Sequence, residues 1–282
     1  MAKRVGVILS GCGRRDGSDV AEAVLALLVI ERAGAVAVCA APDAEQSAIF
    51  DHLNGKPAEP PRQARVEAAR IIGGPILPLS ALDAAAIDAL VIPGGEGAPT
   101  LLSNYADKHE LCQVDPEIAR LLRALLAAHK PMGFVGLSAL LAARVLGPVA
   151  GVRVTLGPRG TTPSKHAAIM GADVRPATAD DVIADQKARV FTTPGFLIEG
   201  AGLAVVARSM DKLVRAVVGG ARDRAPAVAP VGEAGDRPIP AMVGAPPASI
   251  GRAGDRPGNT PAAAPQELSA IEPRRRPRHT RR

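Results

Sequence analysis

The N-terminal part of the chain alternates between two hydrophobic periods. Residues 4–10 form a short apolar run that stops at a Gly-Cys-Gly turn, as a strand buried on both faces of a parallel sheet would. Ser18 is placed to cap the helix that follows, and Gly34 closes this helix before a second apolar run at residues 35–41. The predicted apolar stripe of the helix consists of Ala21, Val24, Leu25, Leu28 and Val29. Strand, helix and strand together predict a right-handed βαβ unit.

The same alternation continues to about residue 220. Segments with a helical period alternate with apolar runs that end at glycine or proline. The predicted strands cover residues 89–92, 131–135 and 189–193, and the predicted helices cover residues 62–69, 115–128, 137–145 and 203–218. This order predicts an α/β fold, a doubly wound and mostly parallel sheet sandwiched by helices. Ligands of such folds bind beyond the carboxyl ends of the strands, where this chain has its glycine-rich turns.

Composition narrows the class of protein further. The 282 residues are 47% hydrophobic and 22% charged, which is typical of a globular chain, and only 2% are aromatic, so the core must be aliphatic. Three scattered cysteines exclude a disulfide framework and lack zinc-ligand spacing, which favours a reducing compartment. The basic N-terminus leads directly into the first predicted strand, and charged residues interrupt each early apolar run. We therefore expect a soluble cytoplasmic protein without membrane contact.

The net charge of +6 is unevenly distributed along the chain. Residues 221–282 hold 11 prolines, 11 arginines and 6 acidic residues, and six of these arginines occupy the last nine positions. This leaves a net charge of +1 for residues 1–220. The composition predicts a single folded domain, residues 1–220, followed by a disordered basic tail. The tail is either a solvated extension or an electrostatic contact to nucleic acid or an acidic partner.

A series of short segments follows an order known from one protein family. Residues 6–13 read Gly-Val-Ile-Leu-Ser-Gly-Cys-Gly, and residues 93–98 read Pro-Gly-Gly-Glu-Gly-Ala. Lys-Pro-Met-Gly-Phe follows at 130–134 and Thr-Thr-Pro at 192–194. The series resembles the ElbB-like family, which is linked to isoprenoid biosynthesis and glyoxalase activity within the PfpI and class I glutamine amidotransferase-like superfamily. Over residues 3–218 the resemblance implies a flavodoxin-like fold, a homodimer and a small carbonyl metabolite as ligand.

Glycine occupies the position of the family's catalytic cysteine. The family reads Gly-Phe-x-Cys at a sharp turn between a strand and a helix, whereas residues 133–136 read Gly-Phe-Val-Gly. By the resemblance, Glu22 is the carboxylate that orients the nucleophile, and Gly136 replaces the nucleophile itself. Glycine adopts the backbone conformation of such an elbow without the steric cost of about 1–3 kcal/mol. We therefore expect the turn to persist without its thiol.

The glycine-rich turn after the third predicted strand is a second candidate binding segment. The family has phenylalanine where this chain has Glu96, which places a carboxylate beside the predicted pocket. The backbone amides of Gly94, Gly95 and Gly97 either line an oxyanion-binding concavity or only turn the chain. Leu137 occupies a position that carries histidine in many relatives, so no histidine flanks the elbow.

Two other groups are candidates to replace the missing thiol. Ser138 lies two residues beyond the elbow, and Cys12 lies in the turn after the first strand. Cys12 is either a small residue packed under the loop or a thiol that contacts a ligand. We expect Cys39 in the core and Cys112 in a polar loop, exposed or half-buried. The histidines lack metal-ligand spacing and no nucleotide-binding glycine motif is present, so we expect neither a metal nor a cofactor.

These features leave three hypotheses on function. The first is a fold-preserving pseudoenzyme that binds a small carbonyl metabolite or a protein partner without cysteine catalysis. The second is an active glyoxalase-type or hydrolytic enzyme that uses Glu22 with Cys12 or Ser138. The third is an interaction protein that works through its basic tail. The missing cysteine favours the first.

Overall fold

The computed structural model describes residues 2–46 and 48–221. These residues belong to the first of two compact units into which the chain divides, Met1–Gly244. The predicted tail, residues 221–282, lies outside the described residues except for Ala221. The predicted domain boundary near residue 220 therefore stays a prediction.

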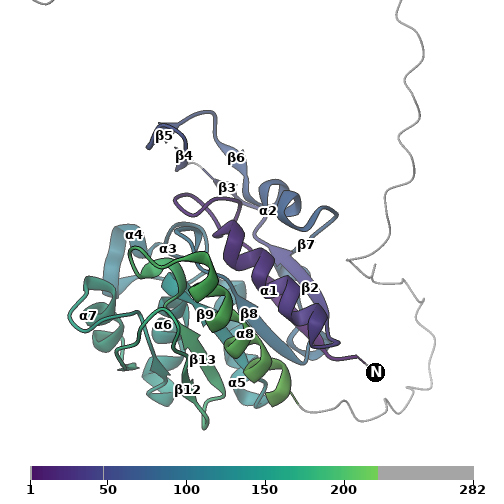
Figure 1. The fold of residues 1–282 in the computed structure, drawn as a ribbon, viewed down its shortest axis with the longest axis vertical. Helices are drawn as coiled ribbons and strands as arrows, with labels where there is room; N and C mark the ends of the chain where they lie inside the picture. The colour runs from purple at the N-terminus through teal and green to yellow at the C-terminus, as the bar shows by residue number, and fades with distance from the viewer. Residues whose placement is uncertain (1, 47, 222–282) are drawn as a thin grey trace, which may run out of the picture. The chain divides into compact units, whose positions relative to one another are not determined.

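A seven-stranded sheet forms the centre of the described domain (Figure 1). In spatial order its strands are β12 (Ile183–Asp185), β13 (Val190–Thr193), β9 (Met132–Val135), β8 (Ala89–Ile92), β1 (Arg4–Ile8), β2 (Val36–Ala41) and β7 (Leu77–Pro78). Neighbouring strands run parallel except for the edge strand β12. β2 lies on one side of β1 and the later strand β8 on the other, which makes their carboxyl ends a topological switch point. The predicted doubly wound, mostly parallel α/β fold is confirmed.

Helices cover both faces of this sheet and divide the core into two layers. Helices α1 (Val20–Arg32), α2 (Ala64–Ile72) and α8 (Leu203–Gly220) cover one face, and α5 (Pro116–Ala127) and α6 (Ala139–Ala150) cover the other. Successive side chains of β1 alternate between the layers, because Val5 and Val7 pack on the α1 side and Ile8 packs on the α5 side. The remaining helices are α3 (Gly97–Thr100), α4 (Tyr105–Lys108) and α7 (Thr162–Ile169), of which α7 contacts α6.

The predicted elements agree with the structure to within a few residues at most boundaries. Asp115 caps α5 and Pro116 is its first residue, as predicted. The predicted helix at 62–69 is shifted, because the chain first forms the short strand β6 (Arg62–Gln63) before α2 begins. The predicted helix at 137–145 begins one residue earlier, as the 3₁₀ turn η4 (Gly136–Ser138) that leads into α6.

Several short elements carried no sequence pattern. Strands of two or three residues are too short to show a hydrophobic period. Besides β6, β7 and β12 they are β3 (Glu45–Gln46), β4 (Ile49–Asp51), β5 (Lys56–Ala58), β10 (Arg153–Val154) and β11 (Asp173–Val174). The further 3₁₀ turns are η1 (Leu79–Ala81), η2 (Ala84–Ala86), η3 (His109–Leu111) and η5 (Gly195–Leu197).

The start and the buried face of α1 differ from the prediction. Asp19, not Ser18, caps the helix, and the Ser18 hydroxyl instead accepts the Ser10 N–H at 2.8 Å. Val24 and Leu28 of the predicted stripe are 46% and 37% exposed. The buried residues are Glu22, Ala23, Ala26, Val29 and Ile30. Small alanines face the sheet and α8 because the helix packs closely there, and the larger valine and leucine are turned outward.

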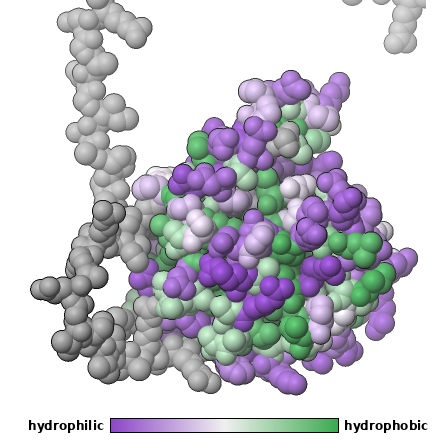
Figure 2. All heavy atoms as spheres, turned by 180° about the vertical axis from the view of Figure 1, so that it is seen from behind, coloured by the Kyte–Doolittle hydropathy of each residue, from purple (hydrophilic) through white to green (hydrophobic). Residues whose placement is uncertain are grey.

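The surface is mixed in character. Figure 2 shows the face opposite to that of Figure 1, where hydrophilic side chains interrupt the hydrophobic ones. Within residues 2–46 and 48–221 no helix is both long enough and apolar enough to span a bilayer.

Candidate functional site

Four adjacent strands of the sheet end at one small cavity. The neighbours β13, β9, β8 and β1 are each followed by a loop that contributes to its wall. The cavity has a volume of about 130 Å³. It is lined by Arg14, Asp19 and Glu22 after β1, Gly95 and Glu96 after β8, Gly136 and Leu137 after β9, and Phe196 and Leu197 after β13. The cavity therefore lies where doubly wound sheets bind their ligands.

Glu22 lines this cavity although the residue is only 1% exposed. It lies in the first turn of α1, where its backbone N–H donates to the capping side chain of Asp19 at 3.1 Å. Its carboxyl oxygens accept two backbone N–H groups at 2.8 Å, Oε2 from Gly94 and Oε1 from Phe196. Loops that follow two other strands thus hold the carboxyl group in one orientation.

Burial changes the acidity of Glu22. Loss of solvent raises the pKa of its carboxyl from 4.5 to about 7, and the negative charge of Asp19 acts in the same direction. The N–H groups of Phe196 and Gly94 and the Arg14 guanidinium oppose the rise. Near neutral pH the carboxyl therefore populates both protonation states and can donate or accept a hydrogen bond toward the cavity.

Gly136 forms the sharp turn between β9 and the helix that follows. Its φ is +55°, in the left-handed region that residues with a Cβ rarely adopt. Because η4 leads directly into α6, the first backbone N–H groups after Val135 have no acceptor within the helix. A Cβ at position 136 would meet Pro194 O at 3.3 Å and Leu197 Cβ at 3.7 Å, so a small side chain fits after a slight adjustment. The turn has the form of a nucleophile elbow with glycine at its apex.

Ser138 was one of two candidates for a replacement nucleophile. In the structure its side chain makes hydrogen bonds to the backbone of the neighbouring strands. The residue is fully buried, and its hydroxyl accepts the Val135 N–H at 2.9 Å. The same hydroxyl donates to Ile92 O of β8 at 2.8 Å. Ser138 therefore ties the elbow to the neighbouring strand and does not line the cavity.

The three cysteines also lie outside the lining of the cavity. Cys12 is half-buried, and burial together with the negative charge of Glu67 raises the pKa of its thiol. Cys39 is buried in β2, as predicted, and burial raises the pKa of its thiol to about 12. Cys112 is 1% exposed, so the prediction of an exposed or half-buried thiol is wrong. Cys112 packs in the core layer of α5 and α6, and its carbonyl oxygen accepts a hydrogen bond from Arg144 of α6 at 2.7 Å.

The backbone N–H groups of the glycine-rich turn after β8 make hydrogen bonds to residues of the loop after β1 and of α1. The N–H of Gly94 donates to Glu22, and the N–H of Gly97 donates to Gly17 O at 3.0 Å. A Cβ at position 94 would collide with the carboxyl group of Glu22. Two of the three amides considered for an oxyanion concavity thus already have protein acceptors, while Gly95 lines the cavity.

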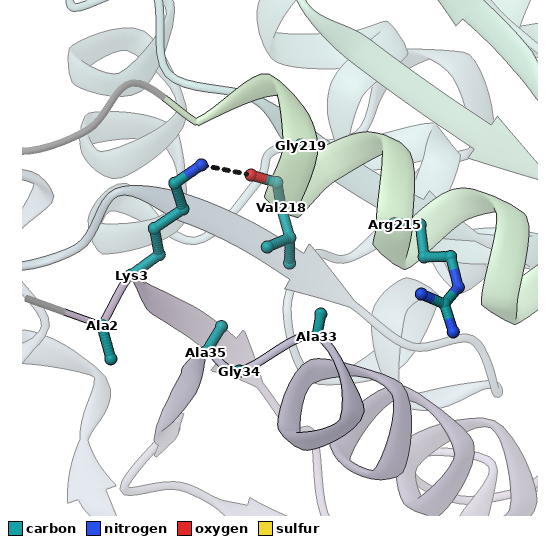
Figure 3. Close-up of a pocket in the computed structure, with 8 residues that line it drawn as sticks. All are labelled: Ala2, Lys3, Ala33, Gly34, Ala35, Arg215, Val218 and Gly219. Atoms are coloured by element: carbon teal, nitrogen blue, oxygen red, sulfur yellow. Dashed lines mark hydrogen bonds between the residues drawn. The ribbon is translucent and has the colours of Figure 1, made fainter.

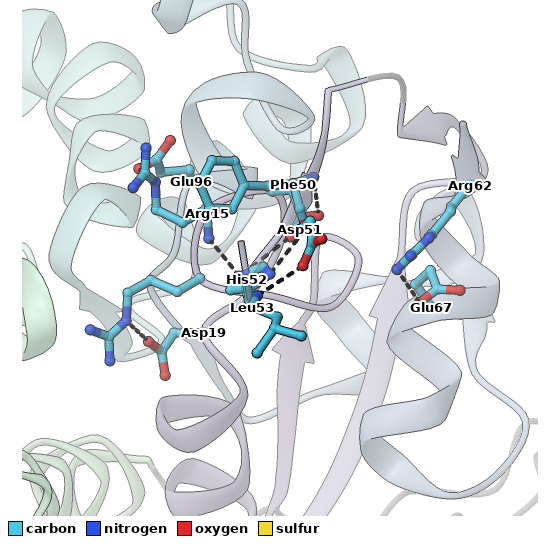
Figure 4. Close-up of polar contacts among 11 residues, drawn as sticks. Arg15, Asp19, Phe50, Asp51, His52, Leu53, Arg62, Glu67 and Glu96 are labelled. Atoms are coloured by element: carbon cyan, nitrogen blue, oxygen red, sulfur yellow. Dashed lines mark hydrogen bonds and ion pairs between the residues drawn. The ribbon is translucent and has the colours of Figure 1, made fainter. Parts of the chain in front are cut away.

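Glu96 lines the same cavity with a carboxylate that is 45% exposed. It pairs with Arg15 at 3.2 Å, and the Arg15 guanidinium lies over the Phe50 ring, 4.4 Å from its centre. Figure 4 shows these residues together with His52, whose Nε2 accepts the Arg15 N–H at 3.4 Å. The segment around β4 and β5 therefore packs beside the loop between β1 and α1.

Four lining residues were not identified from the sequence. Arg14 directly follows the turn at the end of the first predicted strand, and this position was a usable signal. Phe196 and Leu197 follow the last predicted strand, but nothing local to them indicates that their loop turns toward Glu22. The four residues are Arg14, Asp19, Phe196 and Leu197.

A larger surface depression, of about 480 Å³, lies at the opposite end of β1 (Figure 3). There the N-terminal segment meets the end of α8, and Lys3 Nζ donates to Val218 O at 3.2 Å. Most of its other wall residues are alanine or glycine. Because it is far from the carboxyl ends of the strands, we place the candidate site at the smaller cavity.

Across residues 2–46 and 48–221, no group of three or more His, Cys, Asp or Glu side chains is arranged to hold a metal ion.

Comparison with known proteins places the chain in a family. The fold, a mostly parallel sheet with a sharp turn at Gly136 beside the buried Glu22, is that of a protein with a glutamine amidotransferase-like class 1 domain. No family model matches the chain. It belongs to the ES1 family of proteins with a glutamine amidotransferase-like class 1 domain, and the predicted resemblance to ElbB-like proteins is confirmed.

Three similar proteins carry this assignment. The chain is 38% identical over 211 residues to glutamine amidotransferase-like class 1 domain-containing protein 3 of Homo sapiens, covering 71% of this chain and 77% of the relative. It is 37% identical over 207 residues to the ES1 protein homolog of Rattus norvegicus, covering 70% and 76%. A crystal structure of an isoprenoid biosynthesis protein with an amidotransferase-like domain from Ehrlichia chaffeensis superimposes with a TM-score of 0.70 at 29% identity. This match covers 77% of this chain and 99% of the other.

The expected cytoplasmic location is contradicted by these relatives. The proteins from Homo sapiens and Rattus norvegicus, and the similar ES1 protein of Danio rerio, are all named as mitochondrial. These names give a mitochondrial and not a cytoplasmic location for the relatives. A reducing compartment inferred from three unpaired cysteines does not distinguish between the two.

Proposed function

We propose that this protein binds a small metabolite in the cavity of Glu22 and Gly136 and has lost cysteine-dependent catalysis. The observation that carries the proposal is the glycine at the apex of the elbow. Gly136 keeps a φ of +55° beside a buried carboxyl group, and no thiol is among the residues that line the cavity. The turn and the buried carboxyl group are thus present, whereas the thiol expected from the family resemblance is absent from the lining.

The two replacement nucleophiles receive little support from their contacts. The Ser138 hydroxyl is fully buried and is engaged with β8 and β9. Cys12 has a thiol whose pKa is raised by burial, so at neutral pH it is mainly the less reactive protonated form. Both observations favour binding over catalysis by either side chain.

The cavity limits the size and chemistry of the ligand. A volume of about 130 Å³ corresponds to roughly four water molecules in the liquid. Glu22 offers a hydrogen-bond donor or acceptor, depending on its protonation state, and Phe196 and Leu197 offer apolar contact. A compound of a few carbon atoms with a carbonyl or hydroxyl oxygen fits these conditions. The homodimer implied by the resemblance stays a prediction.

The binding proposal is tested with hydroxyacetone, a small neutral hydroxy-ketone. We expect its titration into the labelled full-length protein to shift the amide NMR signals of Gly95, Gly136 and Leu137 in a saturable manner. Glu22→Ala should weaken this binding, and Gly74→Ala should not, because a Cβ at position 74 meets open space. Absence of saturable shifts at the cavity with hydroxyacetone and also with lactate, a hydroxy acid of similar size, would overturn the proposal.

A further inference from the structure

Two consecutive arginines in the loop between β1 and α1 have closely matched surroundings. The guanidinium of Arg14 lies over the Phe196 ring, 4.1 Å from its centre, and Nε donates to Asp19. Arg15 lies over Phe50 and pairs with Glu96. Their side chains are 49% and 53% exposed. Only Arg14 lines the cavity, so the pair offers a comparison between a candidate ligand contact and its immediate neighbour.

Arg14 retains unused hydrogen-bonding capacity. Its hydrogen bond to Asp19 goes through Nε. The two Nη atoms carry four further N–H donors in a fixed fork, and none of these has an acceptor among residues 2–46 and 48–221. A planar fork of this kind matches the two oxygens of a carboxylate.

When Glu22 is protonated, the charged groups at the cavity, with Arg15 behind Glu96 included, sum to zero before a ligand binds. Asp19 is engaged by Arg14 and by the N–H of Glu22, and Glu96 is engaged by Arg15. Glu22 is the remaining carboxyl group of the lining and is uncharged when protonated. The loops after β9 and β13 contribute Gly136, Leu137, Phe196 and Leu197, which carry no titratable side chain.

We propose that the ligand is a small 2-hydroxy- or 2-oxo-monocarboxylate, with its carboxylate on the Nη atoms of Arg14 and its second oxygen against the carboxyl group of Glu22. This inference rests on the proposed binding function and names the class of ligand. The second oxygen distinguishes the class from a simple fatty acid, because only that oxygen uses Glu22. Arg14 is then the residue that selects an anionic over a neutral ligand.

The inference predicts that binding depends on pH. A bound carboxylate is repelled by ionised Glu22, with Asp19 and Glu96 adding negative charge and Arg14 and Arg15 positive charge nearby. Affinity should therefore be highest below the pKa of about 7 that burial gives Glu22. Above that pKa it should fall by up to about tenfold per pH unit, because a proton must be taken up with the ligand.

The test is calorimetric titration of L-lactate into the full-length protein at about pH 6 and at about pH 8. We expect Arg14→Gln to weaken lactate binding at least about tenfold. Arg15→Gln leaves the Glu96 carboxylate without its ion-pair partner but removes no ligand contact, so it should weaken lactate binding by less than about fivefold. Arg14→Lys keeps the charge without the fork and should give an intermediate affinity. Thermal melting of each variant shows that it is folded.

Lactamide, the neutral amide of lactate, separates this inference from the proposed function. It should bind wild type and Arg14→Gln with equal affinity. Equal lactate affinity of wild type and Arg14→Gln, or an equal loss in Arg15→Gln, overturns the inference. If hydroxyacetone binds at the cavity but lactate does not, the inference fails and the proposed function stands. If neither binds, both fail.

Discussion

Glu22 Oε2 accepts the backbone N–H of Gly94 at 2.8 Å, and the same glycine has no room for a Cβ on the side facing that carboxyl. The close approach explains why the turn after β8 needs glycine at this position. It also fixes the carboxyl group that lines the candidate site. The geometry of Glu22 therefore depends on a residue far along the chain.

Gly94→Ala should destabilise the domain. Its Cβ would overlap Glu22 Oε2 and approach Val135 O to 2.9 Å, so the backbone or the buried carboxyl must move. We expect a loss of about 1–3 kcal/mol in the free energy of unfolding, measured by urea denaturation. Gly74→Ala, where a Cβ meets nothing within 4 Å, is the control and should change stability by less than about 0.5 kcal/mol. Equal stability of Gly94→Ala and wild type would show that Glu22 is not held as described.

The raised pKa of Glu22 predicts a decrease in stability with rising pH. Between its unfolded pKa of 4.5 and its folded pKa of about 7, only the folded state keeps the proton, so stability falls as pH rises. Above about 7 both states are ionised and this contribution is lost. The total decrease is about 3 kcal/mol.

The measurement is the free energy of unfolding of wild type and Glu22→Gln from about pH 5 to about pH 8. Glutamine cannot ionise, so the difference between the two proteins isolates the titration of Glu22. The free energy of unfolding of the wild type should decrease relative to that of Glu22→Gln as the pH rises. A difference that is constant over the range contradicts the assigned pKa.

Gly136→Cys should create a reactive thiol. The side chain fits beside Pro194 O and Leu197 Cβ, and the N–H groups at the start of the helix favour a thiolate. We expect faster alkylation by iodoacetamide near neutral pH than at Cys12, Cys39 or Cys112, read by mass spectrometry.

Gly136→Ala provides the matched control for this variant. Both substitutions place a Cβ at a φ of +55° and should cost about 1–3 kcal/mol of stability. Slow alkylation of a folded Gly136→Cys protein would mean that the elbow no longer has the environment of a nucleophile position.

The predicted domain boundary can be tested by truncation. A chain of residues 1–221 should melt at the same temperature as the full chain, because α8 ends at Gly220 and closes the described fold. If the arginine-rich tail binds polyanions, truncation should abolish salt-sensitive retention on heparin. A marked drop in melting temperature would place the boundary later in the chain.

Much of the fold could be predicted because short stretches of sequence indicate the individual strands and helices. The central strands β1, β8 and β9 are short apolar runs that end at glycine or proline, and Asp115-Pro116 marks the start of α5. The face of α1 could not be predicted in this way. Its burial depends on α8, which packs closely against its alanines and leaves Val24 and Leu28 outside.

In the candidate site, too, some residues could be predicted from the sequence near them and others depend on contacts between distant segments. Glu22 was found through the family resemblance, and Gly136 through that resemblance and its position after a strand end. Arg14 was missed although it follows a strand end, and Phe196 was missed because its position beside Arg14 depends on a contact between two distant loops. The pattern around either residue alone carries no sign of that contact.

The most direct test of the central claim is the steady-state turnover of methylglyoxal by the purified full-length protein. Glu22→Ala and Gly136→Ala are measured beside the wild type, with melting curves to show that each variant is folded. Loss of cysteine catalysis predicts that all three proteins give the same rate as buffer. Wild-type turnover that disappears in Glu22→Ala would contradict the account.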